Sequence, residues 1–422
     1  MSTAPPKKSW AVLAYTIAED MASSSRLDTS ARQELKAICD AADFRQVSVA
    51  AQVDFKKVRG IYRGALTDLP PPDRGFKNLA DPANHVLWQK ILAGVNFDAT
   101  RVMVQREASD LNAADADVLQ TFLRFGQDEC PASRYVVSFF GHAAGPLGVF
   151  SDSDPGSTAH DILRLPALVR AFRGSDHKAS VIVFRDCFMN CLETAYQLRN
   201  AAEFVVATQA LAPATGAWPW RAFMASLTPD ATAYEAGLGV AKALGAYLDD
   251  ADNRSGFAAV PYSLLDLSAV DEVAVSLRAL VDALDAARKD PARARACANA
   301  LEAARIGTPE SAKVPGDPAL LDVPTMCGRL AAISGDPVSK AAVALGRLVQ
   351  GRFVRYHHSQ TRDHLGTGLY YKPVRAAHLK ASYLQAADGP VANEDAAEYR
   401  ELALSKATGW HRIALDPLPV DF

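Results

Sequence analysis

Cys187 and His142 are the two residues of this sequence best suited to covalent chemistry. A cysteine thiolate is a strong nucleophile, and a histidine can protonate the amine that leaves when an amide bond breaks. Each ends an apolar run, YVVSFFGH for His142 and SVIVFRDC for Cys187, and the two residues are 45 positions apart. From these residues alone a second interpretation is equally open, in which Cys187 is simply buried and His142 completes a strand end.

The elements that must position these two side chains are apolar runs that alternate with amphipathic stretches. The runs are near-continuous, which predicts strands buried on both faces of a largely parallel sheet. They cover residues 10–16, 47–54, 135–142, 180–187 and 204–209, and the helical stretches cover 29–42, 113–125, 163–173 and 190–200. This alternation predicts the α/β class. Ligands bind at the carboxyl ends of parallel strands, so neighbouring strands would bring both side chains to one edge. The helical pattern after Cys187 predicts a thiol just before a helix N-terminus, which favours the thiolate.

The sequence changes character after residue 268. PYSLLDLS (261–268) is expected to be the last core strand, and residues 269–306 are Ala-rich with helical periodicity that Pro291 interrupts. Helical patterns continue to about residue 350, and the last part, with GTGLYYKP (366–373) and ATGWHRIAL (407–415), is expected to be irregular with short strands. We therefore expect a core domain over 8–268 and a mainly helical C-terminal subdomain over 269–422 that packs on it.

Composition and charge exclude several classes of function. The net charge of −3 provides no electrostatic footprint for nucleic acid or an anionic membrane. No apolar run approaches membrane-spanning length, and the apolar stretch near the start is too short for a signal-peptide core. The six cysteines lack paired spacing and are typical of reduced thiols. We expect a cytoplasmic protein with no nucleic-acid or membrane partner.

Short motifs occur along nearly the whole chain in the order found in one known family. They are KKSWAVLAYTIAED, SVAAQVDF, FFGHAAG, FRDCFMNCLETAYQLRN, FVVATQALAPATGAWPW, GTGLYYKP and ATGWHRIAL. Together they resemble the clostripain family of cysteine peptidases, relatives of the caspases. In caspases the catalytic histidine precedes the cysteine by about 50 residues, close to the spacing of His142 and Cys187.

The resemblance implies a fold and a catalytic apparatus. The fold would be α/β, a caspase-like sandwich with a mostly parallel central sheet and helices on both faces. In the implied cysteine endopeptidase Cys187 is the nucleophile, His142 is the general acid and base, and the N–H groups of Ala143 and Cys187 form the oxyanion hole. Ala143 replaces the usual glycine but keeps its N–H. The implied partners are a protein or peptide substrate and an activating protease or regulator. No cofactor or metal is expected, and calcium is suggested by family resemblance only.

The residue two positions before the nucleophile departs from the family pattern. The family has an aspartate there, which selects Arg or Lys before the scissile bond, but this sequence has Arg185. Thr208 and Gln209, which would line the same pocket with Trp218, add no carboxylate. Because a guanidinium attracts carboxylates and repels cations, we expect a caspase-like preference for acidic residues. Two alternatives stay open: Arg185 points away, or Asp186 supplies an acidic wall for trypsin-like Arg/Lys specificity.

The loop VFSDSDPGSTAHD between the histidine and the cysteine is a candidate processing site. Many relatives are zymogens that are cut in this segment, and an acidic loop rich in Pro, Gly and Ser is suited to proteolytic nicking. Asp152 and Asp154 are the candidate self-cleavage positions, and Asp152 is preferred because Pro155 follows Asp154. The resemblance permits a role in regulated intracellular proteolysis, including bacterial defence or cell death. A degenerate peptidase fold that acts as a binding partner is the remaining alternative.

Overall fold

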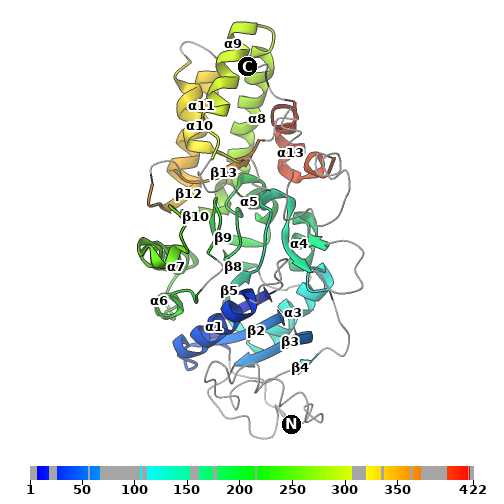
Figure 1. Cartoon of the computed structure of the whole chain (residues 1–422), viewed down its shortest axis with the longest axis vertical. Coiled ribbons are helices and arrows are strands. Elements are labelled where there is room, and N and C mark those ends of the chain that lie inside the picture. The colour runs from blue at the N-terminus through cyan, green and yellow to red at the C-terminus, as the bar shows by residue number, and fades with distance from the viewer. Residues whose placement is uncertain are drawn as a thin grey trace, which may run out of the picture. The chain divides into compact units, whose positions relative to one another are not determined.

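The chain folds into two compact units (Figure 1). The structure is a computed structural model of the 422-residue chain. It describes residues 7–18, 26–55, 58–66, 105–106, 112–152, 161–173, 178–213, 216–306, 320–333, 337–361, 365–371, 397–416 and 418. The first unit comprises residues 1–142, 149–186 and 213–255, and the second comprises residues 143–148, 187–212 and 256–422.

The first unit is built on a sheet whose described strands have the order β8-β5-β1-β2-β3-β4. These strands are β1 (Lys8–Ala18), β2 (Val47–Phe55), β3 (Val58–Leu66), β4 (Gln105–Arg106), β5 (Ala132–Phe140) and β8 (Ala179–Phe184). Neighbouring strands from β8 to β2 run parallel, whereas β3 and β4 continue antiparallel. Strand β8 is buried along its whole length. The parallel arrangement brings the carboxyl ends of β5 and β8 to the same edge, as the sequence predicts.

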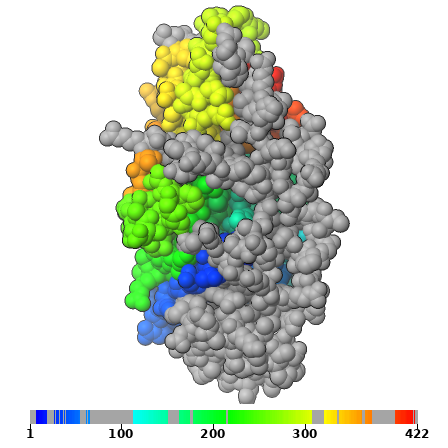
Figure 2. Space-filling view, in the orientation of Figure 1, coloured from blue at the N-terminus to red at the C-terminus, as the bar shows by residue number. Residues whose placement is uncertain are grey.

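Two groups of helices flank the strands of the first unit. Helix α1 packs against α6, which packs against α7, while α3 packs against α4. Their bounds are α1 (Arg26–Ala41), α3 (Ala116–Glu129), α4 (Leu165–Phe172), α6 (Trp220–Ser226) and α7 (Ala233–Asp249). Figure 1 shows the α6–α7 pair and the α3–α4 pair on opposite sides of the strands. Helices α6 and α7 contribute to the green surface on the left of Figure 2. This arrangement confirms the predicted helices near 29–42, 113–125 and 163–173.

The second unit combines short antiparallel strands with packed helices. Strand β10 pairs with β9 on one side and β12 on the other, and β11 pairs with β13. The strands are β9 (Ala202–Thr208), β10 (Tyr262–Asp266), β11 (Leu320–Asp322), β12 (Val354–His358) and β13 (Gly368–Tyr370). The helices include α5 (Leu192–Leu198), α8 (Val270–Ala287), α9 (Pro291–Glu302), α10 (Val323–Ala331) and α11 (Pro337–Leu348). Helix α11 contacts both α8 and α10, and α5 contacts α8.

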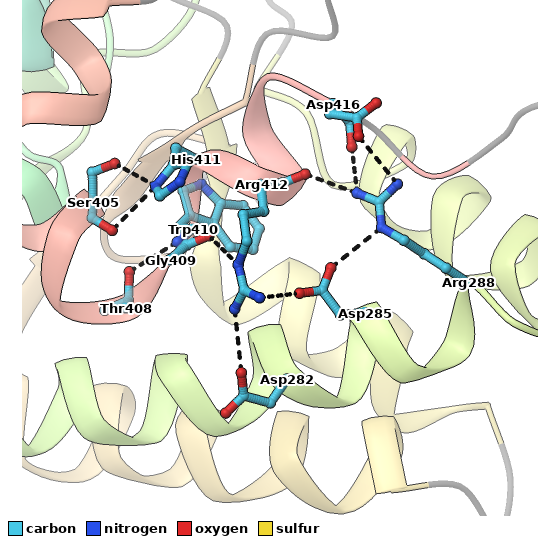
Figure 3. Close-up of polar contacts among 10 residues, drawn as sticks. All are labelled: Asp282, Asp285, Arg288, Ser405, Thr408, Gly409, Trp410, His411, Arg412 and Asp416. Carbon is cyan, nitrogen blue, oxygen red and sulfur yellow. Dashed lines mark hydrogen bonds and ion pairs between the residues drawn. The ribbon is translucent and has the colours of Figure 1, made fainter.

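The C-terminal segment packs onto α8 through one buried ring and a group of surface ion pairs (Figure 3). Trp410 is fully buried and donates a hydrogen bond to the Tyr370 carbonyl at 2.6 Å. Around it, Arg412 pairs with Asp285 at 2.6 Å and with Asp282 at 3.2 Å. Exposed ion pairs contribute little to stability, typically less than about 1 kcal/mol each. The buried Trp410 ring is therefore the main anchor of this segment.

The structure differs from the sequence prediction at two places. The two units do not divide at residue 268, because residues 187–212 pack with the later elements: β9 pairs with β10, and α5 contacts α8. The prediction of short strands in the last part is confirmed within 366–373, where β13 lies, and is wrong over 407–415. That segment is helical and contains α13 (Ala403–Thr408) and α14 (His411–Ala414). Gly409 caps the C-terminus of α13, and its φ of +72° suits glycine. No helix among the described residues is long and apolar enough to cross a membrane.

Candidate active site

Cys187 lies in a turn that follows the buried strand β8 and is the first residue of a segment of the second unit. Its side chain is partly exposed, whereas Cys130, Cys191, Cys297 and Cys327 are buried. The backbone N–H of Ala212 donates to the Cys187 sulfur at 3.3 Å. An N–H donor directed at sulfur stabilises negative charge there, so this contact favours the nucleophilic thiolate.

The backbone around Cys187 is held in an unusual conformation. Phe188, the next residue, has φ of +62°, which few residues other than glycine adopt. Its N–H donates to the Ala210 carbonyl at 3.0 Å, and the Asn190 N–H donates to the Thr208 carbonyl at 2.9 Å. These bonds tie the turn to the end of β9 and fix the direction of the Cys187 side chain.

The predicted position of Cys187 directly before a helix is wrong. Helix α5 begins at Leu192, and its N-cap residue is Cys191 rather than Cys187. The intervening residues form the turn that bonds to β9. The N–H of Ala212 is thus a donor to the Cys187 sulfur, whereas the N-terminus of α5 lies further along the chain.

His142 follows β5 at the carboxyl edge of the first unit's sheet and is partly exposed. Its carbonyl accepts the Phe150 N–H at 2.7 Å. The preceding Gly141 is closely packed, since a Cβ there would lie 3.0 Å from the Phe150 ring and 3.3 Å from the Ile17 carbonyl oxygen. Glycine at this position therefore lets the strand end pass close to its neighbours and fixes the backbone that carries His142.

Ala143 begins a tight loop that belongs to the second unit. The loop closes on itself, with the Ala144 N–H donating to the Gly148 carbonyl at 2.9 Å. Gly145 and Gly148 have φ of +59° and +146°, values that favour glycine. Ala143 is buried, with 6% of its surface exposed. The roles of the Ala143 and Cys187 N–H groups in an oxyanion hole stay predictions.

Arg185 is buried in the first unit, with 2% of its surface exposed. Its guanidinium donates to Glu34 of α1 at 2.6 Å and to the Gly216 carbonyl at 2.6 Å. The guanidinium carbon also lies 4.4 Å from the centre of the Phe140 ring and 5.5 Å from that of Trp218. This finding modifies the sequence interpretation, because the charge of Arg185 is already matched by Glu34.

The sequence analysis did not identify Glu34. It lies on an amphipathic helix, 151 positions before Arg185, and no local motif marks it. Its carboxylate also accepts the Trp218 N–H at 2.8 Å. Trp218 is buried and packs edge-on against Phe223 with ring centres 5.9 Å apart. Glu34 thereby joins the two positions Arg185 and Trp218 that the sequence assigned to substrate binding.

Asp186 is completely buried in the first unit. Burial raises the pKa of its carboxyl well above the usual value, although the charge of Arg185 and the Gly141 N–H act in the opposite direction. A completely buried carboxyl whose charged form is disfavoured in this way does not present an acidic wall to a substrate. The structure thus gives no support to Asp186 as the substitute for the family's aspartate.

Thr208 and Gln209 stand at the end of β9 in the second unit, and both are fully buried. The Thr208 hydroxyl accepts the Ala210 N–H at 3.1 Å. The Gln209 amide donates to Asp322 at 3.0 Å, and Asp322 also caps α10 through the Thr325 N–H. These contacts hold the loop that runs from Thr208 toward Ala212. Among the described residues no group of acidic, histidine or cysteine side chains could hold a metal ion.

The candidate processing loop is described only at its ends. Strands β6 (Val149–Asp152) and β7 (Asp161–Leu163) pair antiparallel, with Asp152 opposite Asp161. Asp152 therefore ends the first strand of a hairpin. Asp154 lies outside the described residues.

Comparison with known families decides the class of the protein. The model of the clostripain family matches residues 93–311, just over half of the chain. The chain belongs to the clostripain family. It is accordingly a cysteine peptidase that acts on proteins or peptides, and the family match includes both His142 and Cys187.

Solved structures of clostripain-family proteases have the same caspase-like α/β fold. A secreted C11 cysteine protease from Bacteroides thetaiotaomicron, bound to an irreversible peptide inhibitor, has a TM-score of 0.64 and 16% identity, over 96% of this chain and 99% of that one. An inactive zymogen C11 protease from Parabacteroides distasonis has a TM-score of 0.62 and 18% identity, over 96% and 99%. No curated protein sequence matches the chain.

Proposed function

We propose that this clostripain-family protein is an endopeptidase that uses Cys187 as nucleophile and His142 as general acid and base. The N–H of Ala212 directed at the Cys187 sulfur is the observation that best supports this role. The constrained backbone at Phe188 and the packed Gly141 before His142 support it too, because both fix a reactive side chain at a strand end. His142 belongs to the first unit and Cys187 to the second. Their action as a catalytic pair is therefore proposed from the sequence and the family.

The proposed reaction has two steps. The Cys187 thiolate attacks the carbonyl carbon of the scissile amide while the N–H groups of Ala143 and Cys187 stabilise the oxyanion. The C–N bond then breaks, and His142 gives its proton to the departing amine. In the second step His142 takes a proton from water, the water oxygen attacks the thioester, and the C–S bond breaks. The acid product and the thiolate are released.

We further propose that the enzyme prefers acidic to basic residues before the scissile bond. Arg185 occupies the position where the family has aspartate. A substrate Lys or Arg before the scissile bond would therefore meet the Arg185 guanidinium instead of a carboxylate. Opposed like charges with little access to water are unfavourable, and Glu34 reduces this cost for basic residues without removing it. Glu34 moderates the preference for acidic residues because it neutralises part of the charge that would attract them.

Cleavage of a peptide library that varies the residue before the scissile bond tests this function, with Cys187→Ala as the blank. We expect cleavage by the wild type only, with Asp and Glu above Arg and Lys by at least about tenfold, a difference of about 1.4 kcal/mol. Cleavage after Arg or Lys would contradict the specificity and favour a trypsin-like enzyme. Identical patterns from wild type and Cys187→Ala would contradict the catalytic role.

A further inference from the structure

Glu34 and Arg185 form a buried ion pair at a position that the proposed function assigns to substrate recognition. The two residues are 3% and 2% exposed, and the Arg185 Nη1 and Glu34 Oε2 atoms are 2.6 Å apart. A buried pair of opposite charges has no net charge, but loss of either partner leaves one charge uncompensated. We call Glu34 and Arg185, together with their contacts Phe140, Gly216 and Trp218, the cluster. Its net charge is set by Glu34 and Arg185 rather than by Arg185 alone.

The pair also organises the loop that carries Trp218. The same Glu34 oxygen that pairs with Arg185 accepts the Trp218 N–H at 2.8 Å, and Arg185 donates to the Gly216 carbonyl at 2.6 Å. The guanidinium lies over the Phe140 and Trp218 rings, which excludes water and favours the cation. Tyr247 lies beside the cluster, since its hydroxyl is 3.2 Å from the place of a Cβ on Gly216.

We infer that Glu34 is a specificity-determining residue: it is the internal counter-ion that limits how strongly Arg185 selects an acidic side chain before the scissile bond. The inference rests on the proposed peptidase function. An incoming carboxylate competes with Glu34 for the same guanidinium, so its gain is reduced by the interaction already present.

Charge counting gives an ordered prediction for four proteins. With Arg185 and Glu34 both present the cluster is neutral, and it is neutral again in the double variant Glu34→Gln/Arg185→Gln. Glu34→Gln alone leaves the Arg185 cation without its counter-ion, and Arg185→Gln alone leaves no cation to attract an acidic side chain. The preference for Asp over its uncharged isostere Asn before the scissile bond therefore rises in the first single variant and falls in the second. The wild type and the double variant lie between them.

The experiment measures kcat/KM for a matched pair of peptides with Asp or Asn before the scissile bond. We expect Glu34→Gln to raise the Asp:Asn ratio by about tenfold and Arg185→Gln to lower it by a similar factor, with the double variant close to wild type. Asp40→Asn is the matched control, because it removes one negative charge from an exposed position of the same helix. It should leave the ratio within about twofold of wild type, since exposed charges are screened.

A purely structural role for Glu34 would give a different result. If both single variants move the ratio in the same direction, or neither moves it, the inference is overturned. Thermal unfolding of each variant identifies misfolding. If Glu34→Gln does not fold, comparison of Arg185→Gln with the double variant still measures the effect of Glu34 on the Asp:Asn ratio. Failure of the wild type to cleave either peptide, together with failure of a peptide electrophile to modify Cys187, would instead contradict the proposed function.

Discussion

At the scale of single residues, partners decide what each ionisable side chain can do. Cys187 has a backbone donor and partial exposure, whereas burial raises the pKa of Cys130 and of Cys327 to about 12. Arg185 has a carboxylate partner, and burial raises the pKa of the Asp186 carboxyl well above its usual value. Sequence identifies which residue types stand at the strand ends, but their charge states depend on contacts with distant segments such as Glu34.

The buried carboxyl of Asp186 makes stability depend on pH. Its pKa in the folded state is raised above the unfolded value of about 3.8, so its stabilising contribution is complete below about pH 4 and is lost as pH rises toward the folded pKa. Asn resembles the neutral acid and does not titrate. We therefore expect the unfolding free energy of Asp186→Asn to increase relative to that of wild type as the pH rises above 4, by up to about 1.4 kcal/mol per pH unit.

Urea unfolding between pH 4.5 and 8 measures this difference. The control is Asp230→Asn, which removes an exposed carboxyl from the same unit and should show no such gain. A constant difference between Asp186→Asn and wild type over this range would mean that the Asp186 carboxyl is ionised in the folded protein.

At the scale of elements, close approaches between helices depend on glycine. A Cβ on Gly239 of α7 would lie 2.3 Å from the Ser226 Cβ of α6, an overlap that a rotamer change cannot relieve. Among the described residues, no atom outside the backbone of its own helix lies within 4 Å of a Cβ placed on Gly328 of α10. Both glycines are inside helices, so the intrinsic gain in helix propensity from alanine is the same for both.

Alanine at these two glycines should therefore have opposite effects. We expect Gly239→Ala to lower stability by about 1–3 kcal/mol through overpacking, although alanine is the better helix former. Gly328→Ala should raise stability by about 0.5–1 kcal/mol. Chemical unfolding monitored by circular dichroism measures both, and stabilisation by Gly239→Ala would contradict the observed α6–α7 packing.

At the scale of the whole molecule, the sequence was sufficient for the class of fold and for most elements. Continuous apolar runs predict β1, β2, β5 and β8, and Pro291, which begins α9, marks the break between two helices. The division into units could not be predicted, because it depends on residues 187–212 packing with elements more than fifty positions later. Nor could the helices at 403–414, since the only strong local signal there is a glycine that ends one of them.

The candidate site was predictable to a similar extent. Cys187 and His142 follow from residue type, position at strand ends and family resemblance. The Ala212 donor and the Glu34 counter-ion are contacts between segments distant in sequence, so only the folded chain reveals them. Both contacts change the chemistry expected from the sequence: an N–H group of a loop, rather than a helix N-terminus, donates to the Cys187 sulfur, and a carboxylate pairs with Arg185.

The most direct test of the central claim is the rate at which a peptide electrophile modifies Cys187 in wild type and in His142→Ala, located by mass spectrometry of the digested protein. The buried Cys130, Cys191, Cys297 and Cys327 serve as internal controls in the same digest. A catalytic pair predicts modification at Cys187 and a loss of at least about 100-fold in rate without His142. Equal rates in the two proteins, or modification elsewhere, would contradict the assignment of Cys187 and His142 as the catalytic residues.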